Sequence, residues 1–288
     1  MAGYFQLKGK KLPLTSNEIQ LVGVMNKITP LVFLIFSAVM ACAQTKIIAH
    51  RGFSGIAPEN TLSAFQKAIE CGAEYLELDV HQSKDGSIVV IHDASVDRTS
   101  SNDKKGAVVE MTDMELAAVK VGYADKFGDQ YKSEKIPTLR EVLTRTKGKI
   151  KVCLEIKVYS VEEAVLKIVR EVGVQDEVII FSFYYPVLAK IRKLDKTIPI
   201  LYLINSADAT TIEYAGVIES KAIGVGPKTA ITKEYLELAH ASGIEVWKWT
   251  VDDEQEMEKL AGIGVDGLIT NFPDKALKIV GQKDSRKE

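Results

Sequence analysis

The chain has 288 residues, of which 46% are apolar and 26% are charged. This length and composition suit one large α/β domain, because barrels of that class commonly reach such a size around a single core. The balance of 37 basic against 39 acidic residues gives a net charge of −2, which argues against a nucleic-acid-binding surface or a polybasic membrane patch. Three cysteines are too few for a disulfide framework.

An apolar run near the N-terminus predicts export. Residues 31–40 read LVFLIFSAVM, which is too short to span a bilayer, where ~20 residues are needed, but matches the apolar segment of a signal peptide. Lys27 precedes the run, and residues 41–43 (Ala-Cys-Ala) form a cleavage site after it. Met25 would start such a signal, which makes residues 1–24 an over-extended start or an added leader. The alternative is a buried core helix.

A lipoprotein signal is the second interpretation of this segment. Residues 39–42 (Val-Met-Ala-Cys) resemble a bacterial lipobox, which would make a lipidated Cys42 the first residue of the mature chain. Both interpretations predict an exported protein, periplasmic or secreted in one case and lipid-anchored in the other. In neither does the mature chain keep a transmembrane helix.

Eight alternating strands and helices follow this leader. Asn60 or Thr61 is expected to cap the first helix, and Gly72 to end it. The predicted strands are 46–49, 74–80, 151–156, 177–181, 198–203, 222–225, 245–250 and 267–270. The predicted helices are 62–71, 139–145, 161–171, 185–194, 207–212, 233–242, 254–261 and 274–280. This count predicts a (β/α)8 TIM barrel over residues 44–281, after a leader and signal peptide at 1–43 and before a charged tail at 282–288.

One polar segment interrupts the alternation. Asp85-Gly86 predicts a hairpin that returns through residues 88–91 to His92. Residues 94–136 then read as a small inserted subdomain, with one short helix expected at 113–119. Because the insertion follows the second strand, we expect it on the face where strands end and substrate enters, and we expect it to influence head-group choice more than chemistry.

Acidic side chains alternate along two predicted strands. Glu77, Asp79 and His81 share one face of the second strand, and Glu155 and Lys157 share a face of the third. If these faces point inward, three carboxylates and an ammonium converge at the barrel mouth. Three hard oxygen ligands suit Ca²⁺ or Mg²⁺. The alternative is a buried Glu–Lys network without a metal.

Two histidines and two cations flank this cluster. His50 and His92 lie at or near strand ends, where one imidazole can take a proton while the other gives one. Arg51 can hold two phosphate oxygens through its planar fork, and Lys157 supplies a second cation. Glu59 is expected to order the preceding loop or to serve as a first-turn acid of the first helix, and the second role is sufficient.

The order of these motifs resembles a known family. The matching residues within positions 50–93 are His50-Arg51-Gly52, Ala57-Pro58-Glu59-Asn60-Thr61, Glu77-Leu78-Asp79-Val80, Asp85-Gly86 and His92-Asp93. They resemble the glycerophosphodiester phosphodiesterase family, and the likeness continues to Asn271. The segment at 266–271 is interpreted as a backbone feature of the last strand end.

The resemblance implies a site as well as a fold. It implies that Glu77, Asp79 and Glu155 bind one divalent cation, Ca²⁺ or Mg²⁺, and that His50 and His92 are the general acid and base, without saying which is which. Substrate binding is then expected from Arg51, Lys157 and Trp249, whereas Trp247, on the same strand face as Trp249, is expected in the core.

The implied reaction is hydrolysis of a small glycerophosphodiester to an alcohol and sn-glycerol 3-phosphate. A related barrel phosphodiesterase acting on intact phospholipid is the first alternative, and it would need an exposed apolar rim at the barrel mouth. A non-catalytic phosphodiester-binding protein is the second alternative. Such a protein would be expected to lack a histidine, a metal-binding acid or the lysine, and all are present.

We predict that the mature native protein lacks residues 1–43, or residues 1–41 if the lipobox is used. The physical basis is the apolar run of signal length that ends in Ala-Cys-Ala. N-terminal mass analysis of the exported protein distinguishes the two cleavage positions and reports any lipid on Cys42. A native protein that retains Met1 or Met25 would contradict the export prediction.

Overall fold

The computed structural model describes residues 4–7, 10–13 and 44–284. The chain divides after Ala43. In the first unit, β1 (Tyr4–Leu7) and β2 (Lys10–Pro13) pair antiparallel. The predicted signal segment and Cys42 lie outside the described residues. Among the helices that are described, none combines the length and hydropathy that a membrane crossing requires.

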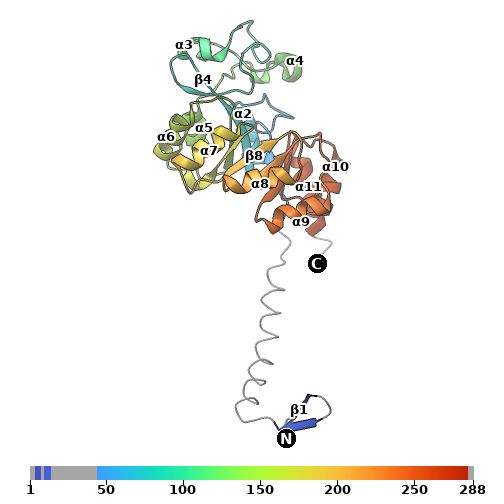
Figure 1. Cartoon of the computed structure of the whole chain (residues 1–288). Helices are drawn as coiled ribbons and strands as arrows, with labels where there is room; N and C mark the ends of the chain where they lie inside the picture. Colours follow the sequence, from blue (N-terminus) through green and yellow to red (C-terminus); the bar gives the residue numbers. More distant parts are fainter. Residues whose placement is uncertain (1–3, 8–9, 14–43, 285–288) are drawn as a thin grey trace. The chain divides into compact units, whose positions relative to one another are not determined.

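Eight parallel strands form a closed barrel in the second unit (Figure 1). Each strand pairs with the next in sequence, and β3 pairs with both β11 and β4, which closes the sheet. The predicted (β/α)8 barrel is therefore confirmed. The strands are β3 (Lys46–Ala49), β4 (Tyr75–Gln82), β6 (Lys151–Ile156), β7 (Val178–Ser182), β8 (Ile200–Ile204), β9 (Ala222–Val225), β10 (Glu245–Lys248) and β11 (Gly267–Thr270).

A helix follows each barrel strand or its extension. Thr61, rather than Asn60, caps the first, because its hydroxyl accepts the Ala64 N–H at 3.2 Å. The last helix continues to Asp284, so the first residues of the predicted charged tail are helical. The helices are α2 (Leu62–Glu70), α5 (Leu139–Thr146), α6 (Glu162–Val172), α7 (Tyr185–Leu194), α8 (Ala209–Val217), α9 (Lys233–Ala241), α10 (Glu254–Ile263) and α11 (Pro273–Asp284).

Large side chains fill the barrel interior. Trp247 is fully buried there, and its ring packs edge-on against Tyr75 and Phe181 with centroids 5.5 and 5.8 Å apart. A Cβ on Gly267 would lie 2.7 Å from the Trp247 ring, so the neighbouring strand accommodates the indole only with a glycine at this position. Trp247 therefore occupies the expected core position and forms part of the floor beneath the barrel mouth.

The insertion begins after a hairpin. β5 (Ile88–Val90) returns antiparallel along β4, and its residue Val90 lies opposite Val80. Figure 1 shows the insertion, with its helices α3 and α4, at the end of β4. It has its own apolar cluster of Val89, Ile91, Val96, Val108, Met111, Leu116, Val119, Val121 and Ile136.

Short helices make up the regular structure of the insertion. They are the 3₁₀ turn η1 (Val108–Glu110), α3 (Asp113–Ala117), α4 (Ala124–Phe127) and the 3₁₀ turn η2 (Gly128–Tyr131). The sequence predicts only the helix at 113–119, which ends slightly earlier than expected. The others are a single turn long, which is too short for an apolar period to appear.

Candidate active site

A tight turn after β3 presents the first site residues. Arg51 has φ +56° and Gly52 has φ +77°. The Arg51 N–H donates to Glu77 Oε2 at 2.8 Å, which ties this turn to β4 and stabilises a left-handed backbone that non-glycine residues rarely adopt. A Cβ on Gly52 would lie 2.6 Å from the backbone of Ala64, so helix α2 can approach only a glycine here.

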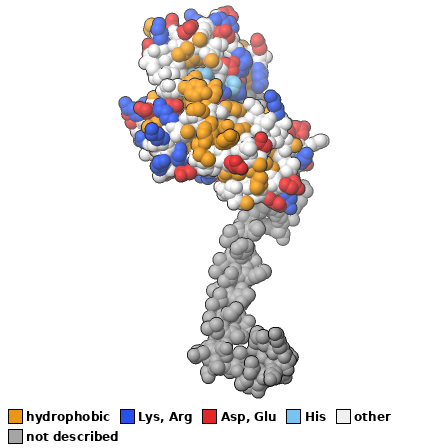
Figure 2. Space-filling model, in the orientation of Figure 1, with side chains coloured by type: hydrophobic (Ala, Val, Ile, Leu, Met, Phe, Trp, Pro, Cys, Tyr) orange, Lys and Arg blue, Asp and Glu red, His pale blue; other side chains and the backbone are white. Residues whose placement is uncertain are grey.

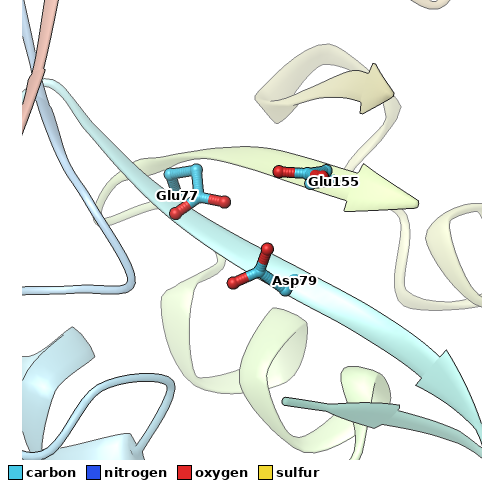
Figure 3. Close-up of side chains that lie close together, drawn as sticks. All are labelled: Glu77, Asp79 and Glu155. Atoms are coloured by element: carbon cyan, nitrogen blue, oxygen red, sulfur yellow. The ribbon is translucent and has the colours of Figure 1, made fainter. Parts of the chain in front are cut away.

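Three carboxylates face one another beyond this turn (Figure 3). Glu77 and Asp79 extend from β4, and Glu155 extends from β6, where it lies opposite Asp79 in the strand register. One oxygen from each residue lies within 4.8 Å of the others. Their exposed fractions are 3%, 1% and 8%, so all three are buried.

Two cations contact this cluster without neutralising it. Lys157 Nζ lies 3.0 Å from Glu155 Oε1 and 3.5 Å from Asp79 Oδ1, and Arg51 Nε lies 3.6 Å from Asp79 Oδ2. Burial opposes ionisation of Asp79, but Lys157 and Arg51 lower its pKa. Burial, followed by repulsion from Asp79, raises the pKa of Glu155 to about 7. The same two causes raise the pKa of Glu77 well above its ordinary value.

His50 is held by an amide. Its Nδ1 lies 2.8 Å from Asn271 Oδ1, and the Asn271 amide nitrogen donates to Asp252 Oδ2 at 2.6 Å. Because a carboxylate only accepts, Asp252 fixes the amide orientation, and Nδ1 of His50 must carry the proton that it shares with Oδ1. Nε2 then keeps its lone pair. Burial, and next the charge of Arg51, lower the pKa of His50 to about 4.

His92 is held by a carboxylate instead. Its Nδ1 lies 2.6 Å from Asp93 Oδ1, and Asp93 also accepts from Arg98. The Arg98 hydrogen bond is the main cause that holds the pKa of Asp93 well below its usual range. His81 bonds the backbone oxygen of His92 through Nε2 at 3.0 Å, which ties β4 to the loop that carries His92.

One pocket of about 250 Å³ collects these groups. All of the site residues proposed from the sequence line it except Asp79, which is buried beside it. Figure 2 shows histidine surface and an apolar band where the insertion meets the barrel. The ionisable side chains of the lining are His50, Arg51, Glu77, His92, Glu155 and Lys157, and the remainder is Phe181, Phe183, Leu203, Trp249, Thr250 and Ile269.

Glu59 corrects one expectation. It is not a first-turn acid of α2, because the helix begins at Leu62, after the Thr61 cap. Its carboxylate accepts from Arg51 Nη1 at 2.9 Å and from Arg98 Nη2 at 2.7 Å. The neighbouring Asn60 donates to Asp79 Oδ2 at 2.9 Å. These two residues therefore support the site, and their position in the motif 57–61 was the signal that could have indicated it.

Asn271 corrects a second expectation. The segment at residues 266–271 is more than a backbone feature, because the side chain of Asn271, directly after β11, hydrogen-bonds His50. The available signal was topological. In a closed barrel the last strand lies beside the first, so a polar residue directly after β11 is a neighbour of the residue directly after β3.

A (β/α)8 barrel with this polar pocket at the carboxyl ends of its strands is the arrangement of a barrel enzyme. The model of the glycerophosphoryl diester phosphodiesterase family matches residues 50–275. The glycerophosphodiester phosphodiesterase of Caldanaerobacter subterraneus is 36% identical over 244 residues, covering 82% of this chain and 98% of that protein. The one from Bacillus altitudinis is 35% identical over 243 residues, covering 82% of this chain and 98% of that protein.

Solved structures agree with these relatives. A phosphodiesterase from Oleispira antarctica, in complex with the product sn-glycerol-3-phosphate, superposes with a TM-score of 0.77 at 28% identity, covering 83% of this chain and 97% of that one. A glycerophosphodiester phosphodiesterase from Agrobacterium tumefaciens gives 0.72 at 28% identity, with 81% and 99% covered. This chain belongs to the glycerophosphoryl diester phosphodiesterase family and is an enzyme of the phosphoric diester hydrolase class.

We predict that the ring of His50 stays neutral down to about pH 4 in buffer without divalent cations. In the unfolded chain it would take up its proton near pH 6.5, so the unfolded state binds more protons between these values. The free energy of unfolding should therefore fall as pH drops from 6.5 to 4, and His50 should account for roughly 1–3 kcal/mol of that loss.

NMR titration of the ring protons measures this pKa directly, and denaturant unfolding of the wild type and His50→Gln between pH 4 and 8 measures the stability. A His50 midpoint at or above 6.5 would contradict the environment described for the ring.

Proposed function

We propose that this enzyme hydrolyses glycerophosphodiesters to an alcohol and sn-glycerol 3-phosphate. The observation that carries the proposal is the pocket of about 250 Å³ that is lined by two histidines, two cations and two of the three clustered carboxylates. Family membership supports the substrate class. So does the Oleispira antarctica relative, whose structure holds sn-glycerol-3-phosphate as product.

Arg51 and Lys157 are proposed to bind the phosphate. Both line the pocket, and both already face carboxylates, so their side chains are held in place before substrate arrives. The Arg51 guanidinium can offer N–H groups to phosphate oxygens, and the Lys157 ammonium acts as a compact charge. Positive charge at these positions stabilises the negative charge that grows on phosphate oxygens in the transition state.

Glu77, Asp79 and Glu155 are proposed to hold one divalent cation, Ca²⁺ or Mg²⁺. The donor set fits, because hard oxygen ligands suit these ions and the three oxygens already lie within 4.8 Å of one another. Burial and the charge of Asp79 raise the pKa of both Glu77 and Glu155, and a bound cation would favour the ionised form of these carboxylates. When bound, such a cation would supply Lewis-acid stabilisation of the phosphate.

His50 is proposed as the general base and His92 as the general acid. Nε2 of His50 keeps its lone pair, and the lowered pKa keeps the ring in the neutral form that can accept a proton from the nucleophile. The Asp93 carboxylate binds Nδ1 of His92 and orients the ring, so that its other nitrogen can give a proton to the leaving alcohol. The proposed base is thus bound to a neutral amide, and the proposed acid is bound to a carboxylate.

A specific observation keeps the intact-phospholipid alternative in view. Tyr159 and Tyr184 follow β6 and β7 at the carboxyl end of the barrel, and their exposed rings stack with centroids 4.5 Å apart. Within the insertion, Val109 and Met114 are also exposed, at 65% and 81%. An apolar group of a substrate could contact these side chains, so the substrate test must include phospholipid.

We predict glycerol 3-phosphate release from glycerophosphocholine or glycerophosphoethanolamine, silenced by chelator and restored by Ca²⁺ or Mg²⁺. The assay measures the glycerol 3-phosphate that is released from each soluble diester. A parallel assay uses phosphatidylcholine vesicles as the substrate. Release of phosphorylated products from the vesicles alone would favour the phospholipid alternative. An enzyme without activity on the soluble diesters in the presence of either metal would contradict the proposal.

We predict that His50→Ala and His92→Ala each lower kcat by about 10²–10⁴-fold, since general acid and base steps are typically worth that much. Both variants should keep the thermal stabilisation that a bound divalent cation gives the wild type. Glu77→Gln, in contrast, should lose that stabilisation. His240→Ala is the matched control, because His240 pairs with Asp266 away from the pocket. Near-wild-type kcat in both site-histidine variants would overturn the assignment.

A further inference from the structure

Arg98, a residue of the insertion, binds two carboxylates that contact active-site residues. The Arg98 guanidinium donates to Asp93 through Nε at 2.6 Å and Nη2 at 3.2 Å. It donates to Glu59 through Nη1 at 2.8 Å and Nη2 at 2.7 Å, and Nη1 also donates to the Tyr123 hydroxyl at 2.7 Å. Since a guanidinium has five N–H groups, every donor of Arg98 has an acceptor.

Both carboxylates bound by Arg98 continue to a pocket residue. Asp93 accepts from Nδ1 of His92 at 2.6 Å, and Glu59 accepts from Nη1 of Arg51 at 2.9 Å. The chain of contacts therefore runs from His92 through Asp93, Arg98 and Glu59 to Arg51. Its two ends are the proposed general acid and a proposed phosphate ligand, which come from different loops of the barrel.

We propose that Arg98 is a positioning residue for the hydrolysis, and this inference rests on the proposed function. Arg98 holds the Asp93 carboxylate against the His92 ring and the Glu59 carboxylate against Arg51. Without its charge, two carboxylates would face each other with no shared cation, and both would move apart. His92 and Arg51 would then lose the partners that fix their orientation.

The contacts separate this role from that of a surface ion pair. Exposed pairs typically contribute ~0–1 kcal/mol and hold flexible side chains weakly. Arg98 instead makes two bidentate contacts, which only a guanidinium fork can form. The insertion also has other attachments: its apolar cluster, and the bonds from Lys126 to the Ser54 oxygen and from Tyr131 to the Ile56 oxygen. Arg98 is therefore not required to keep the insertion in place.

We expect Arg98→Met to lower kcat/KM by about 10²-fold, the effect that a displacement of ~1 Å in a catalytic group can have. Arg140→Met is the matched control. Arg140 pairs with Glu171 on the outer helices, and its side chain is 51% exposed, compared with 43% for Arg98. Arg140→Met should keep wild-type kcat and KM, and both variants should unfold within a few degrees of the wild type.

Double-mutant cycles distinguish positioning from a general loss of structure. If Arg98 acts through Asp93, Arg98→Met should add little to the loss of kcat in Asp93→Asn; if it acts through Glu59, it should add little to the rise of KM in Glu59→Gln. Arg98→Lys should recover only part of the activity, because an ammonium cannot form both forks. Fully additive effects in both cycles would overturn the proposal.

Two further readouts remain informative if a variant is poorly stable or the substrate class is wrong. Millimolar methylguanidinium should restore activity to Arg98→Ala, because the side chain is partly exposed and the solute can replace it. In substrate-free protein, the NMR resonance of the His92 Nδ1 proton should shift or broaden in Arg98→Met but not in Arg140→Met.

The outcomes separate the two proposals. An inactive wild type with a His92 resonance that responds to Arg98→Met contradicts the proposed function alone. An active wild type whose activity and His92 resonance are both unchanged in Arg98→Met contradicts the role of Arg98 alone.

Discussion

The repulsion among three buried carboxylates is the constraint on which the rest of the site depends. Glu77, Asp79 and Glu155 are buried at the barrel mouth with their oxygens close together. Placing an ionised carboxylate there costs several kcal/mol unless charges and hydrogen bonds compensate for the lost hydration. The structure supplies the Arg51 backbone N–H, the Asn60 amide and Lys157. Burial and the neighbouring carboxylates still raise the pKa of Glu77 well above its ordinary value, so these hydrogen bonds and charges offset only part of the cost.

The barrel makes this concentration of charge possible. β3, β4 and β6 are neighbours in the barrel. The residues directly after β3 therefore lie close to the alternate residues of β4 and β6 that share the inward face. The Asp79–Glu155 register places two acids on adjacent strands at one level, above the aromatic floor around Trp247. The apolar side chains of the floor and of the pocket lining lower the local dielectric constant, and electrostatic interactions are stronger in such surroundings.

The strands and the pocket-lining acids could be predicted from the sequence because both follow from alternation. Once β4 was recognised, a period of two placed Glu77 and Asp79 on the same face, and the structure shows that this face is buried. The contacts of Glu59, Arg98 and Asn271 could not be obtained in this way, because loop side chains have no period and their direction depends on tertiary packing. Glu59 was expected in the first turn of α2, but it lies two residues before the Thr61 cap. At this position its carboxylate binds Arg51 and Arg98 and is not part of the N-terminal turn of the helix.

The insertion is not concerned with substrate recognition alone, because one of its residues also contacts groups that hold the proposed catalytic residues. Its apolar cluster makes it a separate packing unit, and Val109 and Met114 are exposed on its surface. Arg98, however, follows Asp93 by only five residues and bonds groups on the barrel side. A residue so close to the hairpin moves little when the outer part of the insertion changes, because the intervening chain is short and held at Val96. The base of the insertion can therefore stabilise the catalytic groups while its outer part remains free to vary with the substrate.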